Sequence, residues 1–178
     1  MRTSITFIAL FVLLMSAAAF SQDDKSKRPS PPAQADCKLA DGKTVHVDYS
    51  SPRMKGRKIY GDLVPYGKVW RAGANEATTL VTTADLTAGG KDIPAGSYTL
   101  FAIPSADKWT LIVSKTTGEW GTDYSGPDHD LARLDMKVTS PTSAMENFTI
   151  SLKPSGSGCT MHMEWEKTEA SIALTEKK

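Results

Sequence analysis

The chain has 178 residues, of which 40% are hydrophobic, and its 21 Lys and Arg nearly balance its 20 Asp and Glu. This length suits one domain of ordinary size, and the hydrophobic fraction is compatible with a packed core. A formal net charge of +1 provides no long-range attraction toward nucleic acid or an anionic membrane surface. We therefore expect no nucleic-acid partner, although the total leaves room for a local basic patch.

Residues 1–21 match the pattern of a secretory signal peptide. A positive charge precedes an apolar run at 5–15, and mostly small residues follow it. A membrane-spanning helix needs about 20 apolar residues, which is more than this run contains. Cleavage near Ala19 or Ser21 would leave an exported protein, periplasmic or secreted, with no stable membrane insertion. The alternative is a retained membrane anchor.

Residues 22–36 form a polar, Pro-rich stretch with almost no large apolar side chain. Such a stretch buries too little surface to offset the entropy lost on ordering, so its composition predicts a flexible tether. We assign residues 37–176 to one β-rich domain, and no internal repeat or second domain is visible in them.

Period-two alternation dominates this domain. Apolar and polar residues alternate in five segments, at 45–49, 134–138, 148–152, 159–165 and 170–174. Alternation over four to eight residues places one face of a strand in a core and the other face in water. The five segments therefore predict strands of a half-buried sheet.

Two further segments, 98–103 and 109–113, are apolar on both faces and predict central strands. The residues between them, 104–108, include Pro, Ser and Asp and predict the turn of a hairpin. No long stretch has helical spacing. About eight short strands separated by turns predict an all-β fold, a single antiparallel β-sandwich with a β-barrel as the alternative.

The two cysteines, Cys37 and Cys159, lie near opposite ends of the predicted domain. Antiparallel folds often bring such ends together, and an exported protein encounters an oxidising compartment. A disulfide is one interpretation of this pair. Two buried, unpaired thiols are the other, because connectivity does not follow from sequence alone.

One segment, residues 50–78, differs from the predicted strands. Its Gly and Pro residues indicate repeated turns. Cations and aromatic residues are interspersed among these turns. Among its cations are Arg53, Lys55, Arg57, Lys58 and Arg71, and its aromatic residues are Tyr60, Tyr66 and Trp70. Guanidinium groups bind carboxylates and phosphates in bidentate geometry, and aromatic faces stack on sugar rings or cations.

These features predict a pocket for a small acidic or carbohydrate-like ligand, such as a cell-envelope fragment. The candidate ligand-binding residues are Arg53, Lys55, Arg57, Tyr66, Trp70, Arg71, Asn75 and Glu76. The alternative is a scaffold, in which polar side chains satisfy the backbone groups of a long crossover. In that case Arg71 pairs with Glu76, and Trp70 belongs to the core.

The same segment carries a resemblance to a known family. The motifs PRMKGRKIYG at 52–61 and LVPYGKVWRAGANEAT at 63–78, with PAGSYTL at 94–100, TGEWGT at 117–122 and DLAR at 130–133, resemble the signature of DUF2911. The resemblance covers roughly residues 44–175. It implies an exported bacterial protein with one β-rich domain. It implies no activity and carries over no catalytic residues, since the family is named for its unknown function.

Other titratable residues suggest two further hypotheses. Glu76 or the loop Asp128–Asp130 would serve as acid and base in a cell-envelope enzyme, although Asp-rich loops are also ordinary turns. His46 and His162 lack the closely spaced ligands typical of structural zinc. The remaining hypothesis is a structural or partner-binding envelope protein without a small-molecule site. We assign no catalytic residue, no metal and no cofactor.

Overall fold

The computed structural model describes residues 24–178, so the predicted signal peptide lies outside the described part of the chain. Within that part there are eleven strands in one antiparallel sheet, two short 3₁₀ turns and no α-helix. The predicted all-β fold is confirmed, with more strands than the eight expected.

The elements follow one another along the chain. They are η1 (Lys25–Lys27), β1 (Pro32–Lys38), β2 (Thr44–Ser50), β3 (Thr78–Thr82), β4 (Leu86–Ala88), β5 (Lys91–Ile93), β6 (Gly96–Ile103), β7 (Lys108–Ser114), η2 (Pro127–His129), β8 (Asp130–Thr139), β9 (Met145–Ser155), β10 (Gly158–Glu166) and β11 (Thr168–Glu176). The seven segments that the sequence indicates as strands lie in β2 and in β6 to β11. The pattern does not indicate β1, β3, β4 or β5.

Neighbouring strands follow the order β1-β2-β3-β6-β7-β8-β11-β10-β9, and the β4–β5 hairpin pairs with β11. β6 and β7 form the expected hairpin, in which Leu100 pairs with Val113. Both strands have neighbours on either side, so the prediction of central strands is confirmed.

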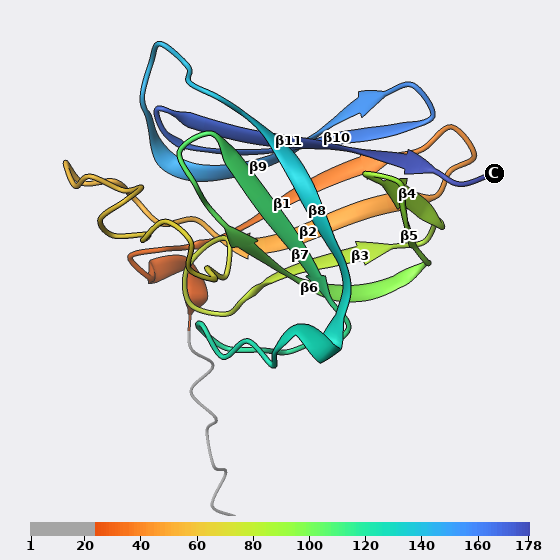
Figure 1. Ribbon diagram of the computed structural model, residues 1–178, viewed down its shortest axis with the longest axis horizontal. Helices are drawn as coiled ribbons and strands as arrows, with labels where there is room; N and C mark the ends of the chain where they lie inside the picture. Colours follow the sequence, from red (N-terminus) through yellow and green to blue (C-terminus); the bar gives the residue numbers. More distant parts are fainter. Residues whose placement is uncertain (1–23) are drawn as a thin grey trace, which may run out of the picture.

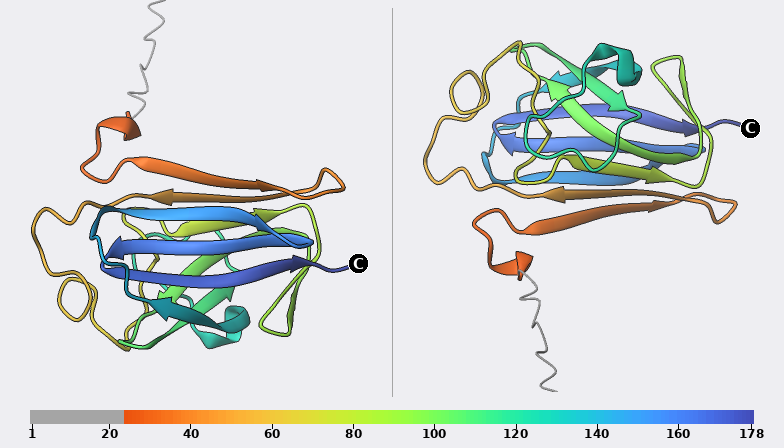
Figure 2. Two further views of the ribbon diagram at one scale, coloured as in Figure 1. Left: turned by 90° about the horizontal axis from the view of Figure 1, so that it is seen from above. Right: turned by 90° about the horizontal axis from the view of Figure 1, so that it is seen from below.

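The sheet curls until its two ends nearly meet (Figures 1 and 2). Just after β2 the chain bonds to β9. The Ser51 hydroxyl donates to the Phe148 carbonyl at 2.6 Å, and the Phe148 amide donates to the Pro52 carbonyl at 2.9 Å. The result is a single sheet nearly closed into a barrel, an arrangement compatible with both predicted architectures. Closure pairs backbone groups that an open edge would expose.

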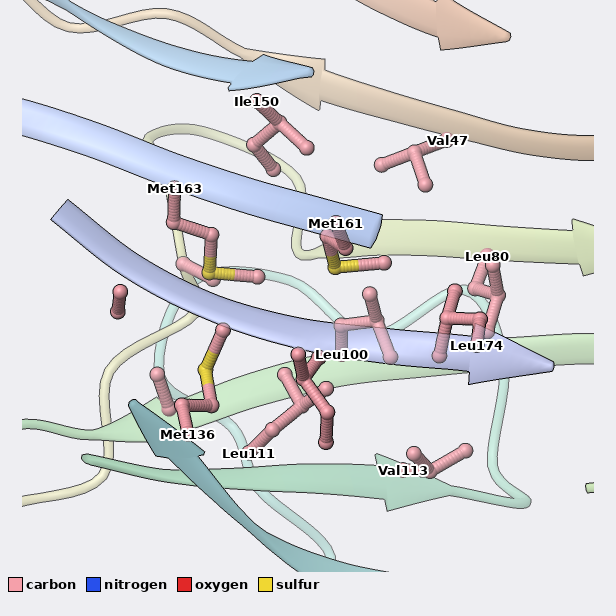
Figure 3. Close-up of a cluster of buried hydrophobic side chains, with 14 of the residues drawn as sticks. Val47, Leu80, Leu100, Leu111, Val113, Met136, Ile150, Met161, Met163 and Leu174 are labelled. Atoms are coloured by element: carbon pink, nitrogen blue, oxygen red, sulfur yellow. The ribbon is translucent and has the colours of Figure 1, made fainter. Parts of the chain in front are cut away.

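Apolar side chains fill the interior of this barrel. Figure 3 shows Val47, Leu100, Met136, Ile150 and Met161 converging from strands on opposite sides. None of the five is more than 3% exposed. The residues on the apolar side of each alternating segment are therefore the ones that meet in the core, and their burial supplies the main stabilising term.

A second, smaller apolar cluster covers the outer face of β6 and β7. Phe101 and Ile112 are both 0% exposed, and the ring of Tyr124 packs edge-on against Phe101 at 5.2 Å. Tyr124 belongs to the long connection between β7 and β8, which lies across this face (Figure 1). That cover explains why these two strands are apolar on both faces.

β1 lies partly in the stretch expected to be a tether. Residues 32–36 belong to this strand and pair with β2, for example Ala35 with Val47. The prediction of a tether up to residue 36 is therefore wrong for these five residues. Its premise was the lack of large apolar groups, but Ala35 and Cys37 are small enough to line the core at 8% and 3% exposure.

Cys37 on β1 and Cys159 on β10 form a disulfide, with their Cα atoms 6.5 Å apart. This outcome excludes the alternative of two unpaired thiols. Among residues 24–178, no helix has the length and hydropathy needed to cross a membrane.

Candidate functional site

The connection between β2 and β3, residues 51–77, is termed the crossover segment. It lies at one end of the barrel, opposite the β4–β5 hairpin and the C-terminus (Figures 1 and 2). Backbone bonds fix it to the sheet. Trp70 and Ala102 of β6 exchange two N–H···O bonds of 2.8 Å, and the Met54 amide donates to the Glu146 carbonyl at 2.7 Å.

Aromatic packing fixes Trp70, a residue of the crossover segment, against the core. Its ring stacks on Trp165 at 6.2 Å and meets Phe148 edge-on at 5.0 Å, and its Nε1 donates to the Gly73 carbonyl at 3.1 Å. Trp70 is only 8% exposed. It is part of the core, as the scaffold alternative predicts, and most of its ring face is not free to stack on a ligand.

Above these rings is a cavity of about 330 Å³, termed the Arg71 cavity. Residues 63–65 and Trp165 supply much of its apolar wall. Its charged lining consists of Arg57, Lys68 and Arg71, and the lining includes no Asp, Glu or His. The arrangement is therefore apolar and positively charged at the same time, and it has no built-in counter-ion.

Arg71 is the least exposed cation of this cavity. Its Nε is fully buried and has no hydrogen-bond partner among residues 24–178. Burial lowers the pKa of Arg71, although an arginine stays charged in proteins. Its Nη1 lies against Gly121, 3.4 Å from where a Cβ would stand, and Gly121 has a φ of 63°. A larger residue at 121 would be strained and would crowd the guanidinium.

Glu76 does not pair with Arg71. Its carboxylate accepts two bonds from Arg28 Nη1, at 3.0 and 3.1 Å, and pairs with Lys25 Nζ at 2.9 Å. The pairing proposed in the scaffold alternative is therefore wrong. Partial burial acts to raise the pKa of Glu76, but the bonds from Lys25, the backbone and Arg28 lower it overall to about 2.

Asn75 and Glu76 together anchor residues 24–31, termed the N-terminal strap. The Asn75 side-chain amide donates to the Ser30 carbonyl at 2.9 Å, and Glu76 holds Lys25 and Arg28. The strap in turn contributes Ser30 to the wall of the Arg71 cavity. These two predicted site residues thus hold a wall in place and do not line the cavity themselves.

The strap anchor makes stability depend on pH. Because the pKa of Glu76 falls from 4.5 to about 2 on folding, its contribution is complete above pH 4.5 and is lost as the pH falls toward 2. We expect Glu76→Gln to lower the free energy of unfolding by up to about 1 kcal/mol at pH 7, because this ion pair is partly exposed.

Urea unfolding of wild type and Glu76→Gln at pH 7 and at pH 2 measures this effect. The difference between the two proteins should shrink toward zero at the lower pH. Asp62→Asn is the control, since Asp62 is an exposed carboxylate of the crossover segment in no ion pair within the described chain. Equal pH profiles for Glu76→Gln and Asp62→Asn would contradict the assignment.

The remaining predicted cations lie around a second cavity of about 400 Å³, lined by Pro29, Ser30, Arg53, Lys55 and Arg57. Arg53 Nη1 donates to the Ser51 carbonyl at 2.7 Å, and Arg57 Nη2 donates to the Arg53 carbonyl at 2.7 Å. Both guanidinium groups therefore order the loop, as the scaffold alternative requires, while they also face a cavity. Lys55 is exposed.

Tyr66 lines neither cavity. Its ring packs over Gly61, where a Cβ would come within 2.9 Å of Tyr66 Cε2, and 46% of the residue is exposed. Lining residues of the Arg71 cavity that were not predicted as ligand-binding include Ser30, Lys68, Thr122 and Trp165. Ser30, Thr122 and Trp165 come from segments far apart in the chain, whereas Lys68 and Thr122 lie in the motifs at 63–78 and 117–122 to which the sequence drew attention.

The residues considered for acid–base or metal chemistry lie elsewhere. Asp130 accepts bonds from Tyr124 Oη at 2.7 Å and from Arg133 Nε at 2.6 Å. His46 contacts Asp36 and Asp48, and His162 contacts Glu169. Within the described residues, no group of three or more His, Cys, Asp or Glu side chains is arranged to hold a metal ion.

Comparison with known protein families gives a match over most of the chain. The model of a family described as "Protein of unknown function (DUF2911)" matches residues 30–174. The matched range contains β1 to β10, most of β11 and the whole crossover segment. No curated protein and no solved structure matches the chain.

Proposed function

Because the chain belongs to the DUF2911 family of proteins of unknown function, we propose its function from the chemistry of the site itself. The protein is an exported binding module that holds a small anionic ligand, an acidic sugar above all, in the Arg71 cavity. The cavity is within the size range of small-molecule sites, at about 330 Å³.

The observation that carries this proposal is the unpartnered Nε of Arg71. Buried donors in proteins nearly always have an acceptor, and a charged donor left without one costs several kcal/mol in a typical case. Arg71 lines the cavity, so a ligand carboxylate or phosphate bound there provides an acceptor for its guanidinium group, whose planar shape suits bidentate contact. Arg57 and Lys68 add positive charge at the same cavity, and no carboxylate in its lining competes for them.

The apolar wall indicates the rest of the ligand. Leu63, Pro65 and Val69 line the cavity together with the cations. An inorganic ion would leave these side chains without contact, whereas a sugar acid presents one charged group and a ring with apolar C–H faces. The proposal therefore favours an organic anion of about the size of a monosaccharide.

Export is part of the same proposal. A disulfide between Cys37 and Cys159 persists in oxidising compartments such as the periplasm or the exterior of the cell. The signal-peptide pattern at residues 1–21 supports the same location.

Acid–base catalysis receives less support than binding. The Arg71 cavity has no Asp, Glu or His in its lining, so it offers no pair of carboxyl or imidazole groups that could exchange a proton. Glu76 is held as an anion by Lys25 and Arg28. Asp130 is occupied by Tyr124 and Arg133.

Calorimetric titration with matched sugars tests the proposal. We expect galacturonic acid and N-acetylmuramic acid to bind, and their neutral counterparts galactose and N-acetylglucosamine to bind much more weakly. Arg71→Gln should weaken binding of the acids at least tenfold, since a hydrogen bond to a charged group contributes about 1.5–3 kcal/mol. Circular dichroism confirms that the variant is folded.

Arg133→Gln is the control, because Arg133 lies on β8, outside both cavities, and pairs with Asp130. This variant should bind the acidic sugars as wild type does. Equal binding by wild type and Arg71→Gln would contradict the proposal. So would equal affinity for acidic and neutral sugars, and an absence of any binding would favour a structural or partner-binding role.

A further inference from the structure

The two cavities adjoin each other. Ser30 and Arg57 line both the Arg71 cavity and the second cavity. Ser30 comes from the N-terminal strap and Arg57 from the crossover segment, so the two cavities adjoin where these two segments meet. The volumes are about 330 and about 400 Å³, so the second cavity more than doubles the space available to a ligand.

Positive charge extends along the whole of this space. The cations that line it are Arg53, Lys55, Arg57, Lys68 and Arg71. None of them forms an ion pair within the described residues, whereas Lys25, Lys43 and Lys108 each pair with a carboxylate. The net charge of the chain is only +1. Five unpaired cations are nevertheless concentrated at this one end of the barrel.

Carboxylates on β9 and β10 accept hydrogen bonds from the backbone of the crossover segment. Glu146 Oε1 accepts from the Lys55 amide at 2.8 Å, and Glu166 Oε2 accepts from the Tyr60 amide at 3.3 Å. Neither residue lines either cavity. These carboxylates moderate the local field, but they form no ion pair with any of the five cations, of which Arg53 and Arg57 also donate to loop carbonyls.

We propose that the two cavities form one elongated site for an acidic oligosaccharide, with a carboxylate of one unit at Arg71 and a carboxylate of a later unit at Lys55 and Arg53. This inference rests on the proposed function and extends it from a single sugar acid to a linked chain. Such a chain would cross from one cavity to the other beside Ser30 and Arg57, which line both.

The distribution of lining groups supports this ligand class. Apolar side chains of residues 63–65 and Val69 line the Arg71 cavity together with its cations, and Pro29 borders the second cavity. A chain of sugar acids carries its charges at intervals, with ring faces between them. An inorganic polyphosphate carries charge on every unit and would leave the apolar groups without contact.

Titration of monomer and oligomer separates the two cavities experimentally. The probes are galacturonic acid, tetragalacturonic acid and inorganic tripolyphosphate, each titrated into the exported protein. Tetragalacturonate should bind at least about tenfold tighter than the monomer, because extra charge-assisted contacts form in the second cavity.

Lys55→Gln and Lys58→Gln are the matched variants. Lys55 lines only the second cavity, and its exposed neighbour Lys58 lines neither. Lys55→Gln should raise the Kd of tetragalacturonate about three- to tenfold and leave the Kd of the monomer unchanged. Lys58→Gln removes the same charge and should change neither, which separates a specific contact from a general loss of positive charge.

The outcomes distinguish the extension from the proposed function. If the monomer binds through Arg71 but tetragalacturonate binds no tighter, the elongated site is wrong and the proposed function stands. Equal effects of the two lysine variants also overturn the extension. If tripolyphosphate binds as tightly as tetragalacturonate, the saccharide class is wrong. If neither monomer nor oligomer binds, the proposed function itself fails.

Discussion

Reduction of the bond between Cys37 and Cys159 should lower the free energy of unfolding by about 5 kcal/mol, if the chain-entropy account of cross-links holds. The two residues are separated by 122 positions, so the bond closes a loop that contains most of the barrel. The bond also links strand β1 covalently to strand β10. An open loop of this length gains much conformational freedom in the unfolded state, and that gain is what the bond prevents.

Urea unfolding of the oxidised and reduced wild type measures this effect without changing the buried sulfur atoms. The double variant Cys37→Ser/Cys159→Ser should lose at least as much, since it also places two hydroxyls at sites that are 3% and 1% exposed. A loss below about 2 kcal/mol on reduction would be well under the chain-entropy value. It would show that strand pairing already restrains β1 in the unfolded ensemble.

Trp165→Ala should cost about 3–5 kcal/mol, the range for removing a large aromatic residue from a core. Trp165 is 1% exposed and contacts the rings of Tyr60, Trp70 and Phe148. Its Nε1 also donates to the Glu146 carbonyl at 3.1 Å. The substitution leaves a void among these rings and removes one of the two donors to the Glu146 carbonyl, which keeps its bond from the Met54 amide.

Trp120→Ala is the matched control, because Trp120 is 55% exposed. The Trp120→Ala substitution should change the free energy of unfolding by less than about 1 kcal/mol, as is usual for surface positions. Trp165→Ala should also weaken sugar-acid binding, since the ring forms part of the Arg71 cavity. Similar losses of stability in the two variants would mean that the aromatic cluster does not support this end of the barrel.

Strand positions were predictable wherever large apolar residues alternate with polar ones. β10 is an example, since Met161, Met163 and Trp165 all face the core. β3 escaped prediction because Thr78 and Thr82 occupy core positions beside Leu80, and their hydroxyls bond to backbone carbonyls. A buried threonine satisfied in this way looks polar in the sequence and obscures the period of two.

The location of the candidate site was predictable from the sequence, but the residue pairs that form ion pairs and hydrogen bonds within it were not. The crossover segment was singled out from its cations and turns, and both cavities lie against it. Its residues nevertheless divide into three roles: Arg71 faces a cavity, Glu76 anchors the strap, and Trp70 belongs to the core. The partner of Glu76 is Arg28, 48 residues earlier, and no sequence spacing indicates such a contact.

The amino-acid sequence alone therefore determined the all-β fold and the hairpin of β6 and β7, because period-two burial and turn residues act over a few neighbouring positions. Its motifs also indicated the family. The tertiary structure alone decided that Cys37 meets Cys159 and that Ser30, Arg71 and Trp165 share one cavity. These residues come together only through the order in which the strands pair and the curl that closes the sheet. Proximity of that kind depends on packing across the whole barrel and leaves no signature in any single segment.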